Sequence, residues 1–234
     1  MSGELDIYIG CMFSGKSTEL QRHVRRLDVI KAPYIIFNHS IDTRYGSNVQ
    51  CTHNKEKITC TSLSHLNDIF LTENPEILET YNRSNYVFIE EAQFFSDLFD
   101  FVINAVNRDG KKVHLYGLDG DYKQEPFGDL LRLIPHADNV HKLKSYCKDC
   151  GDGTMGIFTI RDIDNIEEPI SPKSRLKKMS VDGGGSGKFE KGNLDKLDKH
   201  DAQILIGTDD LYKTVCRKHL LHHKLKLKST HLVE

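Results

Sequence analysis

The chain has 234 residues, and its 32 Lys and Arg nearly balance its 34 Asp and Glu, giving a formal net charge of −2 at pH 7. This length is sufficient for one domain of ordinary size and a smaller lobe, and the charge balance argues against the basic surface of proteins that follow a nucleic-acid backbone. No stretch approaches the roughly 20 apolar residues of a membrane-spanning helix, and the N-terminus lacks a secretory signal pattern. We therefore expect a soluble cytoplasmic protein that binds neither a membrane nor a nucleic acid.

Short apolar runs alternate with segments of helical spacing along residues 1–144. The apolar runs are "LDIYIG" (5–10), "APYIIFN" (32–38), "NYVFIEE" (85–91) and "KVHLYGLDG" (112–120). Between them, "STELQRHVRRLDVI" (17–30) and "DLFDFVINAVNRDG" (97–110) carry apolar residues at helical spacing. This alternation predicts βαβ units, and therefore an α/β fold with a mostly parallel sheet flanked by helices.

The sequence changes character beyond Lys144. A cysteine pair and the apolar stretch "MGIFTI" precede a polar region at 162–201, whose glycine and serine content predicts a flexible insert. Ordered-looking sequence resumes at about residue 202 and ends in a basic tail. We expect an α/β domain at 1–144, a smaller lobe at 145–221 and a tail at 222–234.

The segment "GCMFSGKST" (10–18) matches the P-loop pattern G-x-x-x-x-G-K-[ST], between a predicted strand and a predicted helix. Backbone N–H groups of such a loop converge on phosphate oxygens. Lys16 would neutralise the β and γ phosphates, and the Ser17 hydroxyl would bind magnesium. A chance glycine-rich turn is the alternative, and the strand–loop–helix context disfavours it. The residues expected to bind ATP or GTP with Mg²⁺ are Gly10, Ser14, Gly15, Lys16, Ser17 and Thr18.

Glu90 and Glu91 end the apolar run at 85–91. Carboxyl ends of parallel strands line the ligand crevice of an open α/β sheet. One carboxylate there could hold magnesium while its neighbour accepts a proton from an attacking hydroxyl. A solvated acidic pair at a strand end is the alternative that the two residues alone leave open.

Two spaced pairs predict a metal centre. The six cysteines are too sparse for a disulfide scaffold, but Cys147-x-x-Cys150 and Cys216-x-x-His219 supply three thiolates and an imidazole. That set suits a tetrahedral structural Zn²⁺, which would fix the two ends of the long segment between the pairs and add folding energy.

Other interpretations of these pairs remain open. His222 or His223 could replace His219 as the fourth ligand, although the spacing of His219 mirrors the first pair. A redox C-x-x-C and ordinary reduced thiols are further alternatives.

Several motifs, taken in chain order, resemble one family. They are "GCMFSGKST" (10–18), "DTRY" (42–45), "CTH" (51–53), "EEAQFF" (90–95), "GLDGDYKQEPFG" (117–128), "CKDC" (147–150) and "LYKTVCRKH" (211–219). Together they resemble the zinc-containing, cytosolic-type thymidine kinases, a family that also occurs in bacteria and large DNA viruses. The likeness covers most of the chain except 162–201 and the last dozen or so residues. It implies a RecA-like P-loop domain with a zinc-clipped lobe, and transfer of the γ-phosphate of ATP to the 5′-hydroxyl of thymidine or deoxyuridine.

The resemblance also implies roles for individual residues. Glu91 falls on the family's general base and Glu90 beside it on the magnesium carboxylate, while Asp42 and Arg44 fall on the phosphoryl-transfer centre. The positions that fall on the thymidine pocket are Met12, Phe94, Leu118, Tyr122 and Phe127. The positions that fall on the loop closing over the base, the lasso loop, are Thr159, Leu205, Gly207 and Tyr212. A homotetramer, inhibition by dTTP and a role in nucleotide salvage for DNA synthesis are expected on the same basis.

The chain departs from the family pattern at three of these motifs. Glu90 stands where Asp is usual, so its carboxylate reaches one methylene further, and Tyr122 stands where Phe is usual, adding a hydroxyl. Cys11 replaces a frequent proline in the P-loop. Two other functions compete with the kinase: a P-loop ATPase acting on nucleic acid, disfavoured by the charge balance, and a regulatory nucleotide-binding protein without a base, disfavoured by Glu91.

Overall fold

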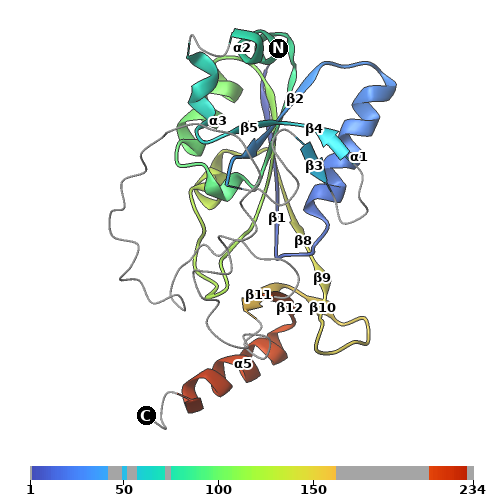
Figure 1. The fold of residues 1–234 in the computed structure, drawn as a ribbon, viewed down its shortest axis with the longest axis vertical. Helices are drawn as coiled ribbons and strands as arrows, with labels where there is room; N and C mark the ends of the chain where they lie inside the picture. The colour runs from blue at the N-terminus through green and yellow to red at the C-terminus, as the bar shows by residue number, and fades with distance from the viewer. Residues whose placement is uncertain (1, 42–48, 52–56, 72–74, 162–210, 231–234) are drawn as a thin grey trace, which may run out of the picture. The chain divides into compact units, whose positions relative to one another are not determined.

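The structure, a computed structural model, describes residues 2–41, 49–51, 57–71, 75–161 and 211–230 (Figure 1). The chain divides into two compact units, residues 1–160 with 213–234 and residues 161–212. Each unit is described by itself. The predicted insert at 162–201 lies outside the described residues, and the predicted division at 144 and 221 stays a prediction.

Six parallel strands form the central sheet, in the order β5-β2-β6-β7-β1-β8. They are β1 (Glu4–Gly10), β2 (Tyr34–His39), β5 (Thr61–Leu63), β6 (Tyr86–Glu90), β7 (Lys112–Gly117) and β8 (Asn139–Leu143). The four apolar runs of the sequence become β1, β2, β6 and β7, whose interior residues are mostly buried. The predicted α/β fold with a mostly parallel sheet is confirmed.

Helices cover both faces of this sheet (Figure 1). Alternate strand residues point to opposite faces, so Tyr8 and Ile36 pack with Leu20 and Val24 of α1 (Lys16–Val29). The other face, which includes Ile7, carries the larger core. The elements that contribute to this core are α2 (Pro75–Arg83), α3 (Leu98–Asn107) and the 3₁₀ helices η1 (Leu66–Phe70), η2 (Ala92–Phe94) and η3 (Leu130–His136).

Short antiparallel ribbons and a last helix complete the described chain. The ribbons pair β3 (Val49–Cys51) with β4 (Lys57–Thr59), β9 (Ser145–Tyr146) with β10 (Met155–Gly156), and β11 (Phe158–Arg161) with β12 (Tyr212–Val215). Helix α5 spans Arg217–Thr230 and therefore includes most of the predicted basic tail. None of the described helices has the length and apolar character needed to cross a membrane.

The parallel register brings one set of strand ends together. β1 ends at Gly10, β2 at His39, β6 at Glu90 and β7 at Gly117. Because all of these strands run in the same direction, the segments that follow them leave the sheet at one edge. The P-loop and the two glutamates therefore lie at the same edge of the domain.

Aromatic rings and histidines fill the α1 face beside the apolar cluster. The His114 ring stacks on Phe88 with centroids 5.0 Å apart and meets the His23 ring edge-on at 5.2 Å. His23 Nδ1 lies 2.9 Å from the Tyr116 hydroxyl. Burial lowers the pKa of His114 to about 4, although the nearby Asp6 carboxylate opposes this shift. His114 is therefore neutral in the folded protein at pH 7.

This burial predicts acid sensitivity. An unfolded histidine has a pKa of about 6.5, so between about pH 6.5 and pH 4 the unfolded chain binds more protons at His114 than the folded one. The free energy of unfolding then falls as the pH falls through that window, by up to about 1.4 kcal/mol per pH unit. The free energy of unfolding can be measured in urea at pH 7 and at pH 4.5. His114→Phe should have a smaller difference between these two free energies than the wild type. The exposed control His65→Phe should keep the wild-type difference, and equal behaviour of the two variants would contradict the prediction.

Candidate active site

The P-loop adopts a conformation suited to an anion. Gly15 has a φ of +86° and Phe13 a φ of +60°, both left-handed, and α1 begins directly afterwards at Lys16. Left-handed residues within such a loop turn successive N–H groups toward one point, at a helix N-terminus that favours negative charge. Ser14 Oγ is buried and has no hydrogen-bond partner among the described residues. A phosphate oxygen would give this hydroxyl a partner.

Lys16 contacts carbonyl oxygens of the predicted phosphate loop, and Ser17 contacts a carboxylate at the end of β6. The Lys16 ammonium donates to the carbonyl oxygens of Cys11 at 2.9 Å and Gly10 at 3.4 Å, so it lies over the loop. The Ser17 hydroxyl donates to Glu90 Oε1 at 2.5 Å. Glu90 ends β6 and is only 3% exposed. A hydroxyl and a buried carboxylate in contact form an oxygen donor pair of the kind that Mg²⁺ prefers.

Glu91 leaves the line of the strand. Its φ and ψ are +52° and +40°, a left-handed conformation that costs about 1 kcal/mol or more for a residue with a side chain and that clusters at functional sites. Its carbonyl then accepts the N–H of Phe94, closing η2. Gln93 Nε2 donates to Glu91 Oε2 at 2.7 Å. Glu91 is therefore turned away from its neighbour Glu90, as a division of roles between the two would require.

Three of the predicted pocket residues gather around Gln93. Phe94 and Phe127 meet edge to face, with ring centroids 5.3 Å apart and planes at 89°. The N–H of Leu118 donates to Gln93 Oε1 at 3.1 Å. The structure thus brings these residues to the strand edge that carries Glu91.

Met12 and Thr159 are also brought together, by the backbone of the P-loop. The Met12 N–H donates to Thr159 Oγ1 at 2.9 Å, and the Thr214 hydroxyl donates to the Met12 carbonyl at 2.8 Å. Gln124 links the nearby loop, because its Nε2 donates to the carbonyls of Tyr122 at 2.6 Å and Thr159 at 3.5 Å. Two threonines therefore hold Met12, one through its N–H and the other through its carbonyl oxygen.

The remaining predicted residues of the site are placed separately. Tyr212 is buried, and the guanidinium carbon of Arg161 lies 6.0 Å from its ring centroid, within the second compact unit. Asp42, Arg44, Leu205 and Gly207 lie outside the described residues.

The predicted metal ligands converge. His219 Nδ1 lies 3.4 Å from the sulfurs of Cys147 and Cys150 and 3.5 Å from that of Cys216, and Cys150 and Cys216 sulfurs are 3.8 Å apart. Bonds of about 2.3 Å to sulfur and 2.0–2.1 Å to nitrogen at tetrahedral angles require separations of about 3.5 Å (S···N) and 3.8 Å (S···S). The cluster therefore has the dimensions to hold a zinc ion.

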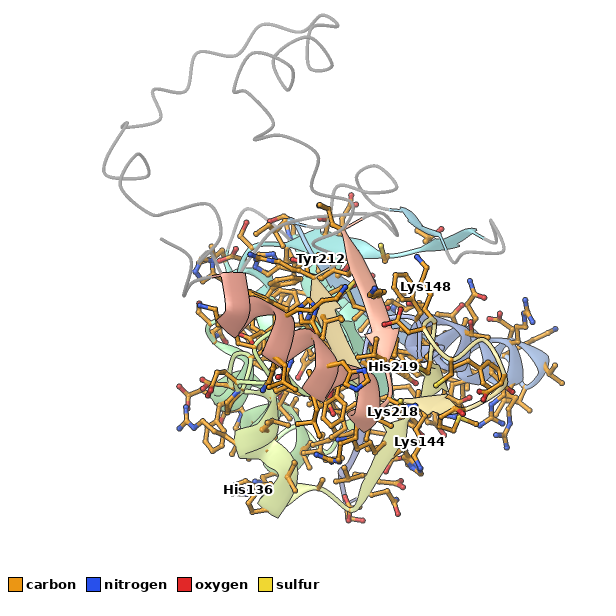
Figure 2. All side chains as sticks on the ribbon, turned by 90° about the horizontal axis from the view of Figure 1, so that it is seen from below. His136, Lys144, Lys148, Tyr212, Lys218 and His219 are labelled. Atoms are coloured by element: carbon orange, nitrogen blue, oxygen red, sulfur yellow. The ribbon has the colours of Figure 1, made fainter. Side chains whose placement is uncertain are left out.

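Among the candidate histidines of α5, His219 is the one that joins the three cysteines. His219 projects from the first turn of α5 (Figure 2) and belongs to the cluster, whose four ligand atoms all lie within 4.8 Å of one another. The His222 ring is 6.0 Å from that of His219 and outside the cluster. A hydrogen bond from the His219 backbone is the main cause that lowers the pKa of the Cys216 thiol. The lower pKa favours the thiolate, which is the form that binds a metal.

Sequence reasoning missed Gln93 and Thr214. Gln93 stands two residues after Glu91 in "EEAQFF", and Thr214 two residues before Cys216 in "LYKTVC". Each is a buried polar side chain, 3% and 2% exposed respectively. A buried polar residue beside a candidate ligand was the available signal, since such groups need partners.

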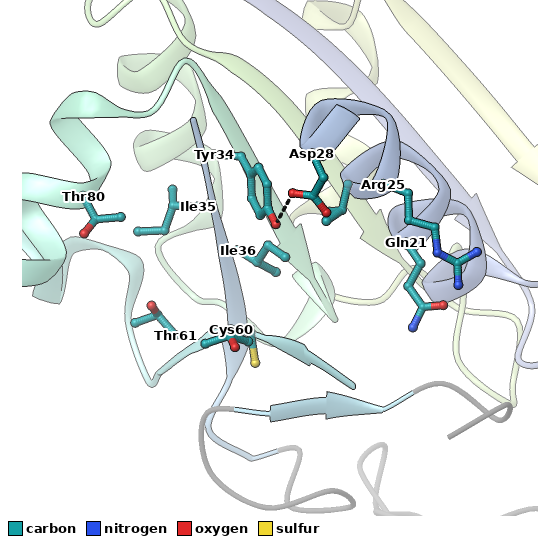
Figure 3. Close-up of a pocket in the computed structure, with 11 residues that line it drawn as sticks. Gln21, Arg25, Asp28, Tyr34, Ile35, Ile36, Cys60, Thr61 and Thr80 are labelled. Atoms are coloured by element: carbon teal, nitrogen blue, oxygen red, sulfur yellow. Dashed lines mark hydrogen bonds between the residues drawn. The ribbon is translucent and has the colours of Figure 1, made fainter. Parts of the chain in front are cut away.

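A separate cavity of about 770 Å³ lies between α1, β2 and the chain around Cys60 (Figure 3). Its lining includes Arg25 and Asp28 of α1, and the Tyr34 hydroxyl donates to Asp28 Oδ1 at 3.0 Å. None of the predicted site residues lines it. It borders the first residues of β2, whereas the predicted phosphate loop follows the last residue of β1, so the cavity is separate from the predicted site.

Comparisons with known proteins agree with the motifs. The family model for thymidine kinase matches residues 3–220. A thymidine kinase of Oryza sativa subsp. japonica is 33% identical over 232 residues, covering 99% of this chain and 71% of the relative. One of vaccinia virus (strain Ankara) is 30% identical over 217 residues, covering 92% and 96%. A cytosolic thymidine kinase of Bos taurus is 35% identical over 148 residues, covering 63% and 58%. The chain therefore belongs to the thymidine kinase family, the one that the order of its motifs predicted.

Proposed function

We propose that this protein transfers the γ-phosphate of ATP to the 5′-hydroxyl of thymidine or deoxyuridine, with dTMP as the product from thymidine. Membership of the family supports the acceptor. The observation that carries the phosphoryl-transfer mechanism is the hydrogen bond between Ser17 and Glu90, residues 73 positions apart in the chain. A P-loop hydroxyl beside a strand-end carboxylate is the arrangement that P-loop kinases use for magnesium.

The nucleotide phosphates would be held by the loop from Gly10 to Thr18. Its N–H groups and the unpartnered Ser14 hydroxyl supply donors, and Lys16 supplies a positive charge that can move from the loop carbonyls to phosphate oxygens. Ser17 and Glu90 would hold Mg²⁺. Magnesium bound there would neutralise charge on the β and γ phosphates.

Glu91 would serve as the general base. Its carboxylate takes the proton of the 5′-hydroxyl while the hydroxyl oxygen forms a bond to the γ-phosphorus and the bond to the β-phosphate oxygen breaks, leaving ADP. The left-handed backbone and the Gln93 hydrogen bond hold Glu91 apart from Glu90. Asp42 and Arg44 would line the same centre, where a guanidinium stabilises charge building on the transferred group.

The nucleoside would lie against the aromatic wall of Phe94 and Phe127. Rings and a thioether suit a flat base with one methyl group. The remaining proposed pocket residues are Met12, Leu118 and Tyr122, and the proposed lasso residues are Thr159, Leu205, Gly207 and Tyr212. Backbone groups of the lasso would read the carbonyl and imide edge of the base.

Zinc in the cluster of Cys147, Cys150, Cys216 and His219 would be structural. It would fix both ends of the lasso segment and add folding energy, because the metal binds only where the ligands converge. A cytoplasmic location, a role in nucleotide salvage, a homotetrameric assembly and inhibition by dTTP complete the proposal on the strength of the family alone.

The acceptor can be tested with the purified protein. With ATP and Mg²⁺, we expect thymidine monophosphate to be the main product from a panel of thymidine, deoxyuridine, deoxycytidine and deoxyadenosine, identified by mass. Removal of Mg²⁺ with a chelator should abolish product formation. Absence of any nucleoside phosphorylation, together with ATP hydrolysis stimulated by single-stranded DNA, would contradict the proposal.

Substitution tests the base. Glu91→Gln should lower kcat by roughly 10²–10⁴-fold, because the 5′-hydroxyl proton loses its acceptor, while the affinity for ATP stays within about twofold. The matched control is Glu79→Gln on α2, whose side chain is 70% exposed, and it should have wild-type kcat. Near-normal turnover of Glu91→Gln would show that Glu91 is not the base.

Substitution of the cluster tests the metal. Cys147→Ser and Cys216→Ser should lose bound zinc, measured by elemental analysis, and unfold at a lower temperature, because the ligand set is incomplete. The control variant Cys60→Ser, which changes a cysteine outside the cluster, should bind as much zinc as the wild type. A zinc-free Cys147→Ser variant with wild-type stability and activity would contradict the structural role.

A further inference from the structure

Gln93 bridges two parts of the site through both ends of its side-chain amide. Nε2 donates to Glu91 Oε2 at 2.7 Å, and Oε1 accepts the Leu118 N–H at 3.1 Å. The orientation of the amide follows from these partners, since a carboxylate only accepts and a backbone N–H only donates. With the amide reversed, both contacts would be repulsive.

The surrounding backbone leaves Gln93 little freedom. A Cβ at Gly117 would come within 2.7 Å of Gln93 Oε1, and a Cβ at Gly128 within 2.2 Å of the Gln93 carbonyl oxygen. Gly128 also has a φ of +61°, which disfavours any other residue. Two glycines from separate segments thus make room for this one residue, which is 3% exposed.

We propose that Gln93 is a positioning residue that orients the Glu91 carboxylate and ties it to the nucleoside-binding wall at Leu118. This inference rests on the proposed function, because it assigns Gln93 a role through Glu91. The Glu91 backbone aims the side chain out of the strand, and the amide then restricts rotation of the carboxylate. The proton acceptor and the pocket wall are thereby kept at a constant separation, which a base acting at hydrogen-bond distance requires.

Only glutamine satisfies both contacts at this length. Glutamate would keep an acceptor for the Leu118 N–H but would set a second carboxylate against Glu91. Methionine matches the volume and provides neither contact at full strength. The two substitutions therefore separate the donor function from the acceptor function.

Steady-state kinetics of the full chain with ATP and thymidine provide the first test. Gln93→Met should lower kcat roughly 10–100-fold and raise the KM for thymidine, with the KM for ATP unchanged. Gln93→Glu should lower kcat, keep a thymidine KM near that of the wild type, and move the acidic limb of the kcat/KM pH profile to higher pH. Gln21, which is 4% exposed on α1 and lines the separate cavity, gives the matched control: Gln21→Met should keep wild-type kinetics.

A double-mutant cycle separates positioning from a general structural effect. In a Glu91→Gln background, adding Gln93→Met should change kcat by less than about twofold, because no carboxylate remains to be oriented. An equal loss of kcat in the two backgrounds would overturn the inference. The affinity for ATP and the unfolding midpoint of each variant, measured in parallel, identify any variant that fails to fold. If Gln93→Met fails to fold, Gln93→Glu replaces it in the double-mutant cycle.

The outcomes distinguish this inference from the function beneath it. A wild-type protein that phosphorylates no nucleoside would overturn the proposed function, and the role of Gln93 with it. A wild type active on thymidine whose Gln93 variants keep wild-type kcat would overturn the present inference alone.

Discussion

The parallel register of β6, β7 and β1 is the constraint on which the rest of the site depends. The P-loop follows β1 and the two glutamates end β6, with β7 between these strands. Because all three strands run in one direction and stay in register, Ser17 reaches across the end of β7 to Glu90. A strand shifted by one residue would reverse the faces of its side chains and separate the hydroxyl from the carboxylate.

The cysteine–histidine cluster extends this constraint to the P-loop. Strand β12 ends at Val215, directly before the ligand Cys216, and it carries Thr214, whose hydroxyl holds the Met12 carbonyl. A metal that holds Cys216 would therefore also hold the strand that fixes one P-loop peptide. Folding energy from a metal bound there would therefore be available to order the predicted phosphate loop as well as the segments that carry the ligands.

Glu90 and Glu91 show how adjacent, similar residues can acquire different environments. Glu90 keeps the strand conformation and is buried against Ser17. Glu91 turns into the left-handed region and is held by Gln93. The change of backbone conformation between them places the Glu90 carboxylate against the Ser17 hydroxyl and the Glu91 carboxylate against the Gln93 amide.

Much of this arrangement was predictable from local patterns. The alternation of apolar runs and helical segments was enough for the parallel α/β sheet, and the two spaced pairs were enough for the cluster of Cys147, Cys150, Cys216 and His219. The phosphate-binding role of residues 10–18 stays a prediction. The division that sets a basic tail at 222–234 apart stays a prediction, and helix α5 spans Arg217–Thr230.

The sequence by itself determined the features that near neighbours specify: strand and helix periods, a loop that needs glycine, and ligands separated by two residues. Only the tertiary structure decided that Gln93 joins Glu91 to Leu118, that Thr214 and Thr159 hold Met12, and that the partly buried His23 and His114 lie among tyrosines. These contacts connect residues from different elements, and some are more than a hundred positions apart. Their formation depends on strand order and register, which a local pattern does not encode.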